Sequence, residues 1–288
     1  MLSGSFVATV TPFKDGVLDE KTFRNLLDRQ MEAGTTGVVP CGTTGESATL
    51  SYEEHKHLIE LTVGHVKGKM KVIAGAGSNC TSEAIELARH AEGSGADAVL
   101  VITPYYNKPT QKGMILHFEA VAKSITIPLV VYNVPGRTGV SIDVDTLAEL
   151  NKIPNITAIK EASGSVDRVS AVLGKTSLTV LSGDDSLTFP MMMVGAKGVI
   201  SVTANVVPKL VAQMVDAALK GDVETGRKIH HQLFGLSSKL FLETNPLPAK
   251  AALAKMGLIQ NELRLPLCPM SSDKFKILED ELVKMKLV

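Results

Sequence analysis

The sequence predicts an α/β protein, a (β/α)8 TIM barrel followed by a C-terminal helical appendix. Short β-branched runs alternate with longer segments of helical periodicity through most of the chain, which is the pattern of repeated βα units around a parallel sheet. Eight such runs can be counted before the pattern becomes helical only. Eight units favour a closed barrel over an open sheet, for which we would expect a clear glycine-rich first turn.

Each predicted strand is a short apolar run, and most are rich in valine or isoleucine. In chain order the strands are 6–10, 37–40, 71–75, 98–102, 128–133, 156–160, 178–183 and 198–202. The helices predicted between them carry apolar residues three and four positions apart. They include 20–33, 52–66, 82–94, 111–124 and 143–150.

Only helical segments follow the last predicted strand. They are 208–220, 223–241, 249–256 and 275–285. Because the later ones exceed what a barrel needs, we predict two domains. Residues 1–222 form the catalytic barrel and residues 223–288 form a C-terminal helical domain.

Charge and cysteine content exclude several classes of protein. Thirty Lys and Arg residues balance thirty Asp and Glu residues, so neither a nucleic-acid footprint nor a polybasic membrane patch is expected. No apolar stretch approaches the ~20 residues of a membrane helix, and the start lacks the features of a signal peptide. Cys41, Cys80 and Cys268 are an odd number at unrelated spacings, which is typical of a reducing compartment. The prediction is a cytoplasmic protein with neither a nucleic-acid nor a membrane partner.

The chemistry of a (β/α)8 barrel lies at the carboxyl ends of its strands, so the residues that follow each strand are the candidates. In order they are Thr11 and Pro12, then 41–47, 75–79, 103–109, 132–139, 160–164, 182–186 and 201–205. One lysine, three tyrosines, paired threonines and one arginine therefore converge on a single rim.

Lys160 ends an apolar strand, where a buried amine is costly unless it is used or paired. Desolvation disfavours the cation, and a neutral amine can attack a carbonyl carbon to form an imine. Each later proton movement needs a hydroxyl within reach, which Tyr132 on the neighbouring strand could supply. Two structural alternatives stay open: Lys160 pairs with an acid such as Glu161, and Tyr132 is a core tyrosine with a satisfied hydroxyl.

The Gly-Thr-Thr-Gly stretch offers backbone N–H groups and the hydroxyls of Thr43 and Thr44, which suit a carboxylate such as that of a 2-oxo acid. Arg137 could bind a second carboxylate bidentately. Alternatively, the threonines cap the next helix, for which Ser47 and Glu53 are rival start signals. Arg137 alone is also typical of a solvated loop cation.

Other motifs favour structural roles. Tyr105 and Tyr106 beside proline are typical of a rigid exposed turn or an interface. The histidines are not spaced for one helix face, which argues against a metal site, and no dinucleotide fingerprint is complete. The charges of Asp184 and Asp185 argue against a phosphorylated substrate. Cys41 is interpreted as a packed thiol.

Six motifs together resemble the 4-hydroxy-tetrahydrodipicolinate synthase (dihydrodipicolinate synthase) family of Schiff-base-forming pyruvate aldolases, a superfamily that includes N-acetylneuraminate lyase. They are GTTGES, TPYYNKP, YNVPGRTG, IKEASG, LSGDDS and GVISVTAN, in this order. The resemblance runs from Gly4 to the RLP at 264–266, essentially the whole chain.

The resemblance implies a lyase of lysine and diaminopimelate biosynthesis that uses no metal and no organic cofactor. Pyruvate would form an imine on Lys160, and the derived enamine would attack L-aspartate 4-semialdehyde. Ring closure would then release the lysine and give 4-hydroxy-tetrahydrodipicolinate. The resemblance implies that Tyr132 shuttles protons and is linked through Thr44 to a Tyr106 of the neighbouring subunit. It implies that Thr43 and Thr44 bind the pyruvate carboxylate and that Arg137 binds the semialdehyde carboxylate. It also implies that the main chain at Gly183 and Ile200 lines the site.

The resemblance also implies a homo-oligomer, usually a dimer of dimers, and an L-lysine effector site. That site matches Ser47, Ala48, His55, Asn79, Glu83 and Tyr105. Tyr52 stands where lysine-inhibited enterobacterial-type members carry histidine, which sets this chain apart from them. Two other functions stay open: an aldolase acting on a sugar acid, and a catalytically silent barrel that binds a metabolite.

Overall fold

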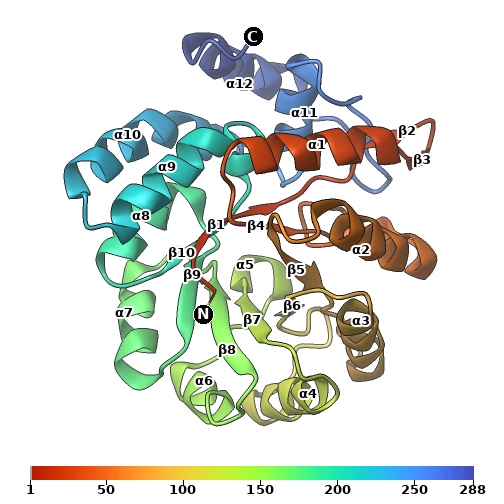
Figure 1. The fold of residues 1–288 in the computed structure, drawn as a ribbon, viewed down its shortest axis with the longest axis vertical. Helices are drawn as coiled ribbons and strands as arrows, with labels where there is room; N and C mark the ends of the chain where they lie inside the picture. The colour runs from red at the N-terminus through yellow and green to blue at the C-terminus, as the bar shows by residue number, and fades with distance from the viewer. Residues whose placement is uncertain (1) are drawn as a thin grey trace.

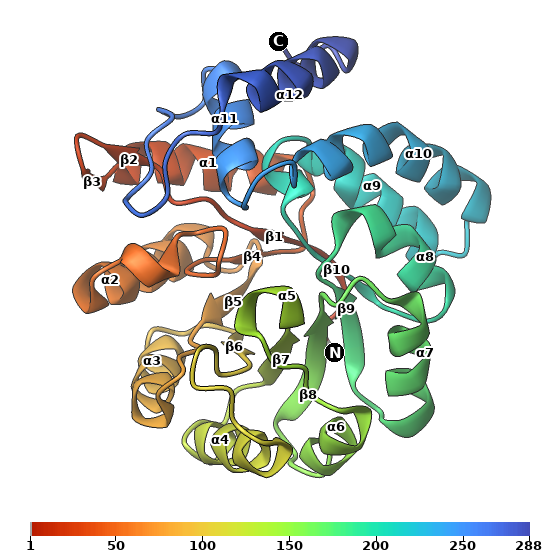
Figure 2. The ribbon, with the colours of Figure 1, turned by 180° about the vertical axis from the view of Figure 1, so that it is seen from behind.

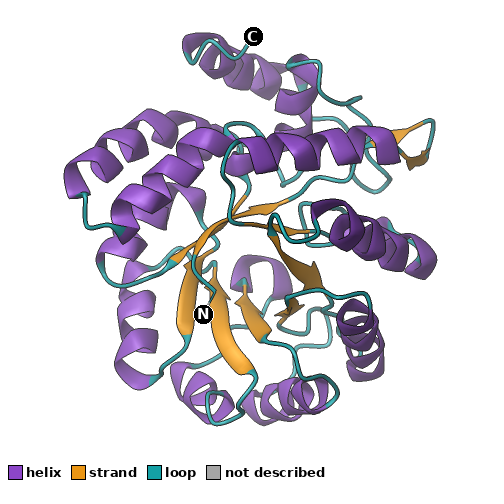
Figure 3. Ribbon diagram, in the orientation of Figure 1, coloured by secondary structure: helices purple, strands orange, loops and turns teal. Residues whose placement is uncertain are grey.

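The computed structural model describes residues 2–288 and contains a closed barrel of eight parallel strands, which confirms the predicted fold class. Around the barrel the strands neighbour one another in the order β1-β10-β9-β8-β7-β6-β5-β4. Their bounds are β1 (Gly4–Ala8), β4 (Gly37–Val39), β5 (Lys71–Gly75), β6 (Ala98–Ile102), β7 (Leu129–Asn133), β8 (Ile156–Glu161), β9 (Thr179–Ser182) and β10 (Gly198–Ser201). Figure 1 and Figure 3 show them enclosed by helices.

The outer ring is formed by the helices that alternate with the strands. They are α1 (Glu20–Glu32), α2 (Tyr52–Val66), α3 (Thr81–Gly93), α4 (Gln111–Lys123), α6 (Val144–Leu150), α7 (Val166–Lys175), α8 (Thr188–Met193) and α9 (Pro208–Leu219). The predicted helices all occur, with ends that differ by a residue or so. Their amphipathic faces bury apolar side chains against the strands, as Phe23 and Leu27 of α1 do.

The first strand is displaced from its prediction. We expected residues 6–10, whereas β1 begins at Gly4 and ends at Ala8. The apolar run continues past the strand, but the main-chain N–H of Val10 donates to the side chain of Asn205 at 3.2 Å and not to a neighbouring strand. Apolar character alone did not show where the ladder ends.

Short elements at the rim were not predicted. The hairpin of β2 (Phe13–Lys14) and β3 (Val17–Leu18) follows β1, and the single turn α5 (Pro135–Thr138) follows β7. In Figure 2 α5 lies in front of the strands. Proline at the first position of α5 suits a helix start, since it lacks the N–H that would be unpaired there.

The C-terminal appendix is helical, as predicted. It contains α10 (Val223–Lys239), α11 (Leu247–Lys255) and α12 (Ser272–Lys284). The helix α10 packs against α9 and α8 of the barrel, and α12 packs against α10 and α11. Figures 1 and 2 both show α11 and α12 outside the ring on the side of α1. The domain boundary at residue 222 stays a prediction.

Two apolar cores divide the molecule. A large one fills the space between strands and helices. A smaller one fills the barrel interior and consists of Phe6, Ala8, Val39, Ile73, Ala98, Leu100, Val130, Tyr132, Val134, Ala158, Leu181 and Ile200. Successive residues of a strand face opposite sides, so the interior core fixes which rim residues point inward. None of the helices in the described residues is long and apolar enough to cross a membrane.

Candidate active site

Lys160 and Tyr132 lie side by side on neighbouring strands of the barrel. They are direct register partners between β8 and β7. Both side chains are buried, with 6% and 7% of their surface exposed. The Lys160 Nζ lies 4.2 Å from the centroid of the Tyr132 ring. The structure thus brings together the predicted nucleophile and the predicted proton shuttle.

Glu161 is not the partner of Lys160. It faces the other side of β8, where its carboxylate accepts hydrogen bonds from Arg168 Nε at 2.9 Å and from Asn133 Nδ2 at 3.0 and 3.1 Å. Among residues 2–288, no carboxylate forms an ion pair with the Lys160 amine. The alternative of a structural Lys160–Glu161 pair is therefore wrong.

Neither Thr43 nor Thr44 caps a helix. The cap of α2 is Ser51, whose side chain accepts from the N–H of Glu54, while the Glu54 carboxylate accepts from the N–H of Ser51. Ser47 and Glu53, the rival start signals, are not the cap either. Thr44 is buried, and its Oγ1 accepts a hydrogen bond from Asn245 Nδ2 at 2.9 Å. Both threonines remain available for a ligand.

Arg137 lies on α5 and borders the same region. Its Nη2 donates to the main-chain carbonyl of Asn245 at 3.1 Å. Its side chain lines a cavity of about 490 Å³ together with Tyr132 and Thr43. Arg137 is an exposed residue, as a loop cation would be, but it has a main-chain partner and borders the cavity.

That cavity extends from the barrel mouth to α2 and α3. Besides Thr43, Tyr132 and Arg137, its wall includes Ser47, Ala48, His55, Glu83 and Tyr105 of the predicted lysine site. Asn79, the sixth residue predicted there, is not in the wall, and its carbonyl accepts from Asn107 Nδ2 at 2.9 Å. Tyr132, Thr43 and Arg137 therefore border the same space as five of the six predicted effector residues, whereas Lys160 and Thr44 are not in its wall.

The other predicted site residues lie deeper or farther out. Ile200 belongs to the barrel-interior core with Tyr132. Gly183 lies against Lys160, since a Cβ built on it would be 3.0 Å from Lys160 Cε, and its N–H donates to the Glu161 carbonyl at 2.7 Å. Tyr106 is 89% exposed at a left-handed φ of 70° and does not line the cavity.

Electrostatics differ between the cavity's polar groups. Burial lowers the pKa of His55, partly offset by the hydrogen bond between its Nε2 and the Gly75 carbonyl at 2.7 Å. Burial and the neighbouring Glu83 raise the pKa of Tyr52 to about 12. Ser78 donates to Glu83 at 2.6 Å. The outer part of the cavity thus presents an imidazole whose charged form is disfavoured by burial, a phenol and the acidic side chain of Glu83.

Asp184 and Asp185 have structural partners. Asp185 is buried and accepts from the side chain of Ser201 and from the N–H groups of Val202 at 2.8 Å and Thr203 at 3.2 Å. Asp184 accepts from the N–H of Gly164 at 2.9 Å. Burial is the largest influence on both carboxyls and raises the pKa of each. They tie the rim loops together.

Cys41 is a packed thiol, as predicted. It is buried, and its Sγ lies 3.5 Å from the main-chain carbonyl of His55. Burial raises the pKa of the thiol, which disfavours the reactive thiolate. In the described chain no three His, Cys, Asp or Glu side chains are grouped as a metal site.

Thr244 and Asn245 are among the contributors to the cavity wall that sequence reasoning missed. They belong to the loop between α10 and α11, within a segment predicted only as an appendix. The only local signal was the Asn-Pro-Leu-Pro stretch that starts at Asn245, which marks a turn but not a site.

Known proteins similar to this chain cover nearly all of it. The model of the Dihydrodipicolinate synthetase family matches residues 1–285. A 4-hydroxy-tetrahydrodipicolinate synthase of Syntrophobacter fumaroxidans is 53% identical over 284 residues, 97% of this chain and 98% of the relative. Dihydrodipicolinate synthase from Acinetobacter baumannii, solved with pyruvate, is 43% identical, with a TM-score of 0.98 over 100% of both chains. The synthase from Cyanidioschyzon merolae, solved with lysine bound, is 37% identical, with a TM-score of 0.95 over 99% of both chains. The chain belongs to the dihydrodipicolinate synthetase family.

Proposed function

We propose that this protein condenses pyruvate with L-aspartate 4-semialdehyde through a Schiff base on Lys160, giving 4-hydroxy-tetrahydrodipicolinate for lysine and diaminopimelate biosynthesis. The observation that carries the proposal is the buried amine of Lys160, free of a carboxylate partner among the described residues, at 4.2 Å from the Tyr132 ring. A buried amine without a structural role is suited to nucleophilic attack. The pyruvate held by the Acinetobacter baumannii relative supports the choice of keto acid.

The reaction begins when the Lys160 amine attacks the C2 carbonyl of pyruvate and water leaves, which forms an imine. Loss of a proton from C3 gives an enamine, and C3 then forms a bond to the aldehyde carbon of the semialdehyde. The aldehyde oxygen takes up a proton to become a hydroxyl. The amino group of the semialdehyde attacks C2 and displaces the lysine, so that one water is released overall. Tyr132 is placed to move the protons.

The two carboxylates of the substrates need separate sites. Thr43 and Thr44 would bind the pyruvate carboxylate with hydroxyl and backbone donors, and Arg137 would bind that of the semialdehyde. Main-chain groups at Gly183 and Ile200 would complete the pocket around the lysine. The Gly183 N–H already donates to the Glu161 carbonyl, so the Gly183 carbonyl is the main-chain group that would face the substrate.

The two other functions considered from the sequence are less well supported. A sugar-acid aldolase would meet the Arg137 cation at the mouth of the cavity, where a sugar presents only hydroxyls. A silent binding protein would have no use for an amine buried without a carboxylate partner in the described residues.

Assembly, regulation and location follow as parts of the same proposal. The exposed Tyr106 would serve a neighbouring subunit in a homo-oligomer, a dimer of dimers. L-Lysine would bind where Ser47, Ala48, His55, Glu83 and Tyr105 meet, because Glu83 can pair with an ammonium group. The relative solved with lysine supports this effector. The three cysteines are free, which supports the cytoplasm as its compartment.

The test combines borohydride trapping with a Lys160→Ala variant. Wild-type protein reduced with borohydride in the presence of pyruvate should gain one pyruvate-derived adduct on Lys160, located by mass spectrometry. Lys160→Ala should fold, lack the adduct and keep less than about a few per cent of the condensation rate, because the covalent route is lost. Lys71→Ala removes an exposed lysine paired with Asp97 and should keep both the adduct and the rate. An adduct on another lysine, or full turnover without Lys160, would refute the proposal.

A further inference from the structure

Asn245 connects the C-terminal appendix to the candidate active site. It lies in the loop between α10 and α11, and only 5% of its surface is exposed. Its side chain donates from Nδ2 to Thr44 Oγ1 at 2.9 Å, across 201 residues of chain. Its main-chain carbonyl accepts from Arg137 Nη2 at 3.1 Å. One residue therefore contacts a side chain from each of the two proposed carboxylate sites.

The contact with Thr44 fixes the direction of a hydrogen bond. A threonine hydroxyl has one hydrogen to donate and two lone pairs to accept with. Because Asn245 donates to Oγ1, the Thr44 hydrogen stays free for another acceptor, such as the Tyr132 oxygen or a substrate carboxylate. The Asn245 Oδ1 is buried with no hydrogen-bond partner within residues 2–288. The buried amide is thus held by its donor half alone.

The chain that follows Asn245, from α11 onward, is attached at a second place to the loop that carries Thr43 and Thr44, residues 41–46. Lys250 is fully buried, and its Nζ lies 2.5 Å from Glu46 Oε1 and 2.9 Å from the Thr11 carbonyl. The N–H of Arg264 donates to Glu46 Oε2 at 3.1 Å. A double attachment restricts the freedom of both loops, as a preorganised site requires.

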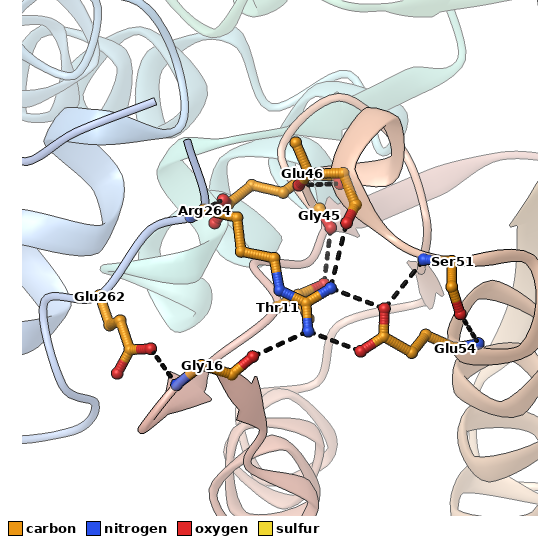
Figure 4. A network of polar contacts seen from close by, with 9 residues as sticks. Thr11, Gly16, Gly45, Glu46, Ser51, Glu54, Glu262 and Arg264 are labelled. Carbon is orange, nitrogen blue, oxygen red and sulfur yellow. Dashed lines mark hydrogen bonds and ion pairs between the residues drawn. The ribbon is translucent and has the colours of Figure 1, made fainter. Parts of the chain in front are cut away.

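Arg264 extends this anchor to the start of α2. Figure 4 shows its guanidinium between the Glu54 carboxylate and the Gly16 carbonyl, with Glu46 and Gly45 close by. The distance from Arg264 Nη2 to Glu54 Oε1 is 2.5 Å. Thr11 donates to the Gly45 carbonyl at 2.7 Å. The turn from Gly45 to Glu54 is therefore held by Thr11 at its start and by Arg264 at Glu46 and Glu54.

We propose that Asn245 is a positioning residue of the condensation reaction: its amide N–H holds Thr44 as an acceptor, so that the Thr44 hydroxyl donates toward the reacting groups. The inference rests on the proposed function, because it assigns a role within that reaction. It makes the appendix a working part of the active site. The carbonyl contact to Arg137 belongs to the main chain, so side-chain substitutions at 245 leave it in place.

The test compares Asn245→Asp with Asn245→Ala. Aspartate keeps the shape but offers no N–H, so Thr44 would donate toward it and lose its hydrogen for the reaction. Both variants should lower kcat by about 10-fold to 100-fold, while the KM for the semialdehyde changes little because the Arg137 contact stays. Asn151→Asp is the matched control, since Asn151 Nδ2 donates to the Ser177 hydroxyl at 3.1 Å away from the rim, and should keep the wild-type kcat.

A double-mutant cycle separates positioning from mere structural support. If Asn245 acts through Thr44, adding Asn245→Ala to Thr44→Val should lower kcat less than twofold further. A multiplicative loss, or an Asn245→Asp variant with wild-type kcat, would overturn the inference. Borohydride trapping of pyruvate on Lys160 in the wild type is run alongside. If wild-type Lys160 carries the adduct but the Asn245 variants keep the wild-type kcat, only this inference is refuted. If wild-type Lys160 carries no adduct, the proposed function itself is refuted.

Discussion

Lys160 and Glu161 are consecutive residues of β8, but their side chains have entirely different surroundings. Consecutive residues of a strand face opposite sides of the sheet. Lys160 therefore points into the barrel beside Tyr132, and Glu161 points outward to Arg168 and Asn133. On the outward side, the charges of Glu161 and Arg168 pair with each other. On the inward side, the Lys160 amine has no carboxylate partner among the described residues.

His117 on α4 carries a pH prediction. It is buried, its Nδ1 lies 3.0 Å from the Thr81 hydroxyl, and burial lowers its pKa from 6.5 to about 4. Between these values the unfolded chain binds a proton that the folded chain does not. The free energy of unfolding should therefore fall as the pH drops from 6.5 to 4, by up to about 3 kcal/mol from this residue.

The measurement is chemical denaturation at several pH values for the wild type and His117→Gln. Glutamine removes the titrating group, so the variant should show a shallower loss of stability between pH 6.5 and 4. Equal slopes for the two proteins would show that His117 does not contribute.

At the residue scale, the sequence was informative where strand ends could be located. Lys160 and Tyr132 lie at the ends of predicted strands and the threonine pair follows one, and barrel geometry alone brings strand ends to one rim. Asn245 could not be found in this way, because its contact with Thr44 spans 201 residues and starts from a loop without periodicity. Nor does spacing show that Tyr132 and Lys160 are register partners, which depends on the barrel's stagger.

Among the elements, the loop after β4 depends most on distant partners. Glu46 adopts a φ of 55°, a left-handed conformation that is uncommon for residues other than glycine. Its carboxylate is buried with Lys250, and the Lys250 and Arg264 cations flank the Phe13 ring at 4.5 and 4.3 Å from its centroid. Burial is the largest influence on the pKa of Lys250 and lowers it. The ion pair stabilises the loop only while both members are present.

We expect Lys250→Met to lower the free energy of unfolding by about 3–5 kcal/mol, because it leaves the Glu46 carboxylate buried without a cation. Adding Glu46→Gln should restore a large part of that loss, since Gln removes the charge and can still accept from Arg264. Urea denaturation measures both. Lys276→Met breaks an exposed pair with Asp280 and should change stability little. A Lys250→Met protein as stable as the wild type would contradict this account.

The helices and strands themselves were predictable from periodicity, but the short rim elements were not. The turn α5 and the hairpin of β2 and β3 are set by local hydrogen bonds and turn residues, not by a repeating apolar face. The span of α2 was predicted at 52–66, but its cap was not identified, because Ser51 and Glu54 follow several other plausible capping residues.

For the molecule as a whole, the eight βα units predicted the barrel. The helical pattern of the C-terminal appendix did not indicate that it contributes to the cavity wall. Helical periodicity says which face is apolar but not what that face covers. Tyr106 is exposed and has a left-handed φ, and its sequence pattern likewise does not show whether another subunit contacts it. A lone chain leaves this tyrosine outside its own cavity.

Subunit complementation tests whether Tyr106 serves a neighbouring site. Lys160→Ala and Tyr106→Phe chains should each have low activity alone. After subunit exchange, half of the dimers would be hybrids with one complete site, so the mixture should recover about a quarter of the wild-type rate. Native mass spectrometry of the mixture measures the fraction of hybrid dimers, and sizing confirms assembly. No recovery despite exchange would place Tyr106 outside the reaction.

Gly183 lies directly against the end of the Lys160 side chain, where a Cβ would come within 3.0 Å of Cε. A Cβ at this position would also lie 2.6 Å from the Cβ of Ala162, so the space is closed to any larger residue unless the rim shifts. In the proposed reaction, imine formation and hydrolysis would both require the terminal bonds of Lys160 to rotate while its backbone stays fixed in the strand. A side chain at 183 would therefore press on the terminal bonds of Lys160, and glycine is the residue that avoids this contact in a tightly filled interior.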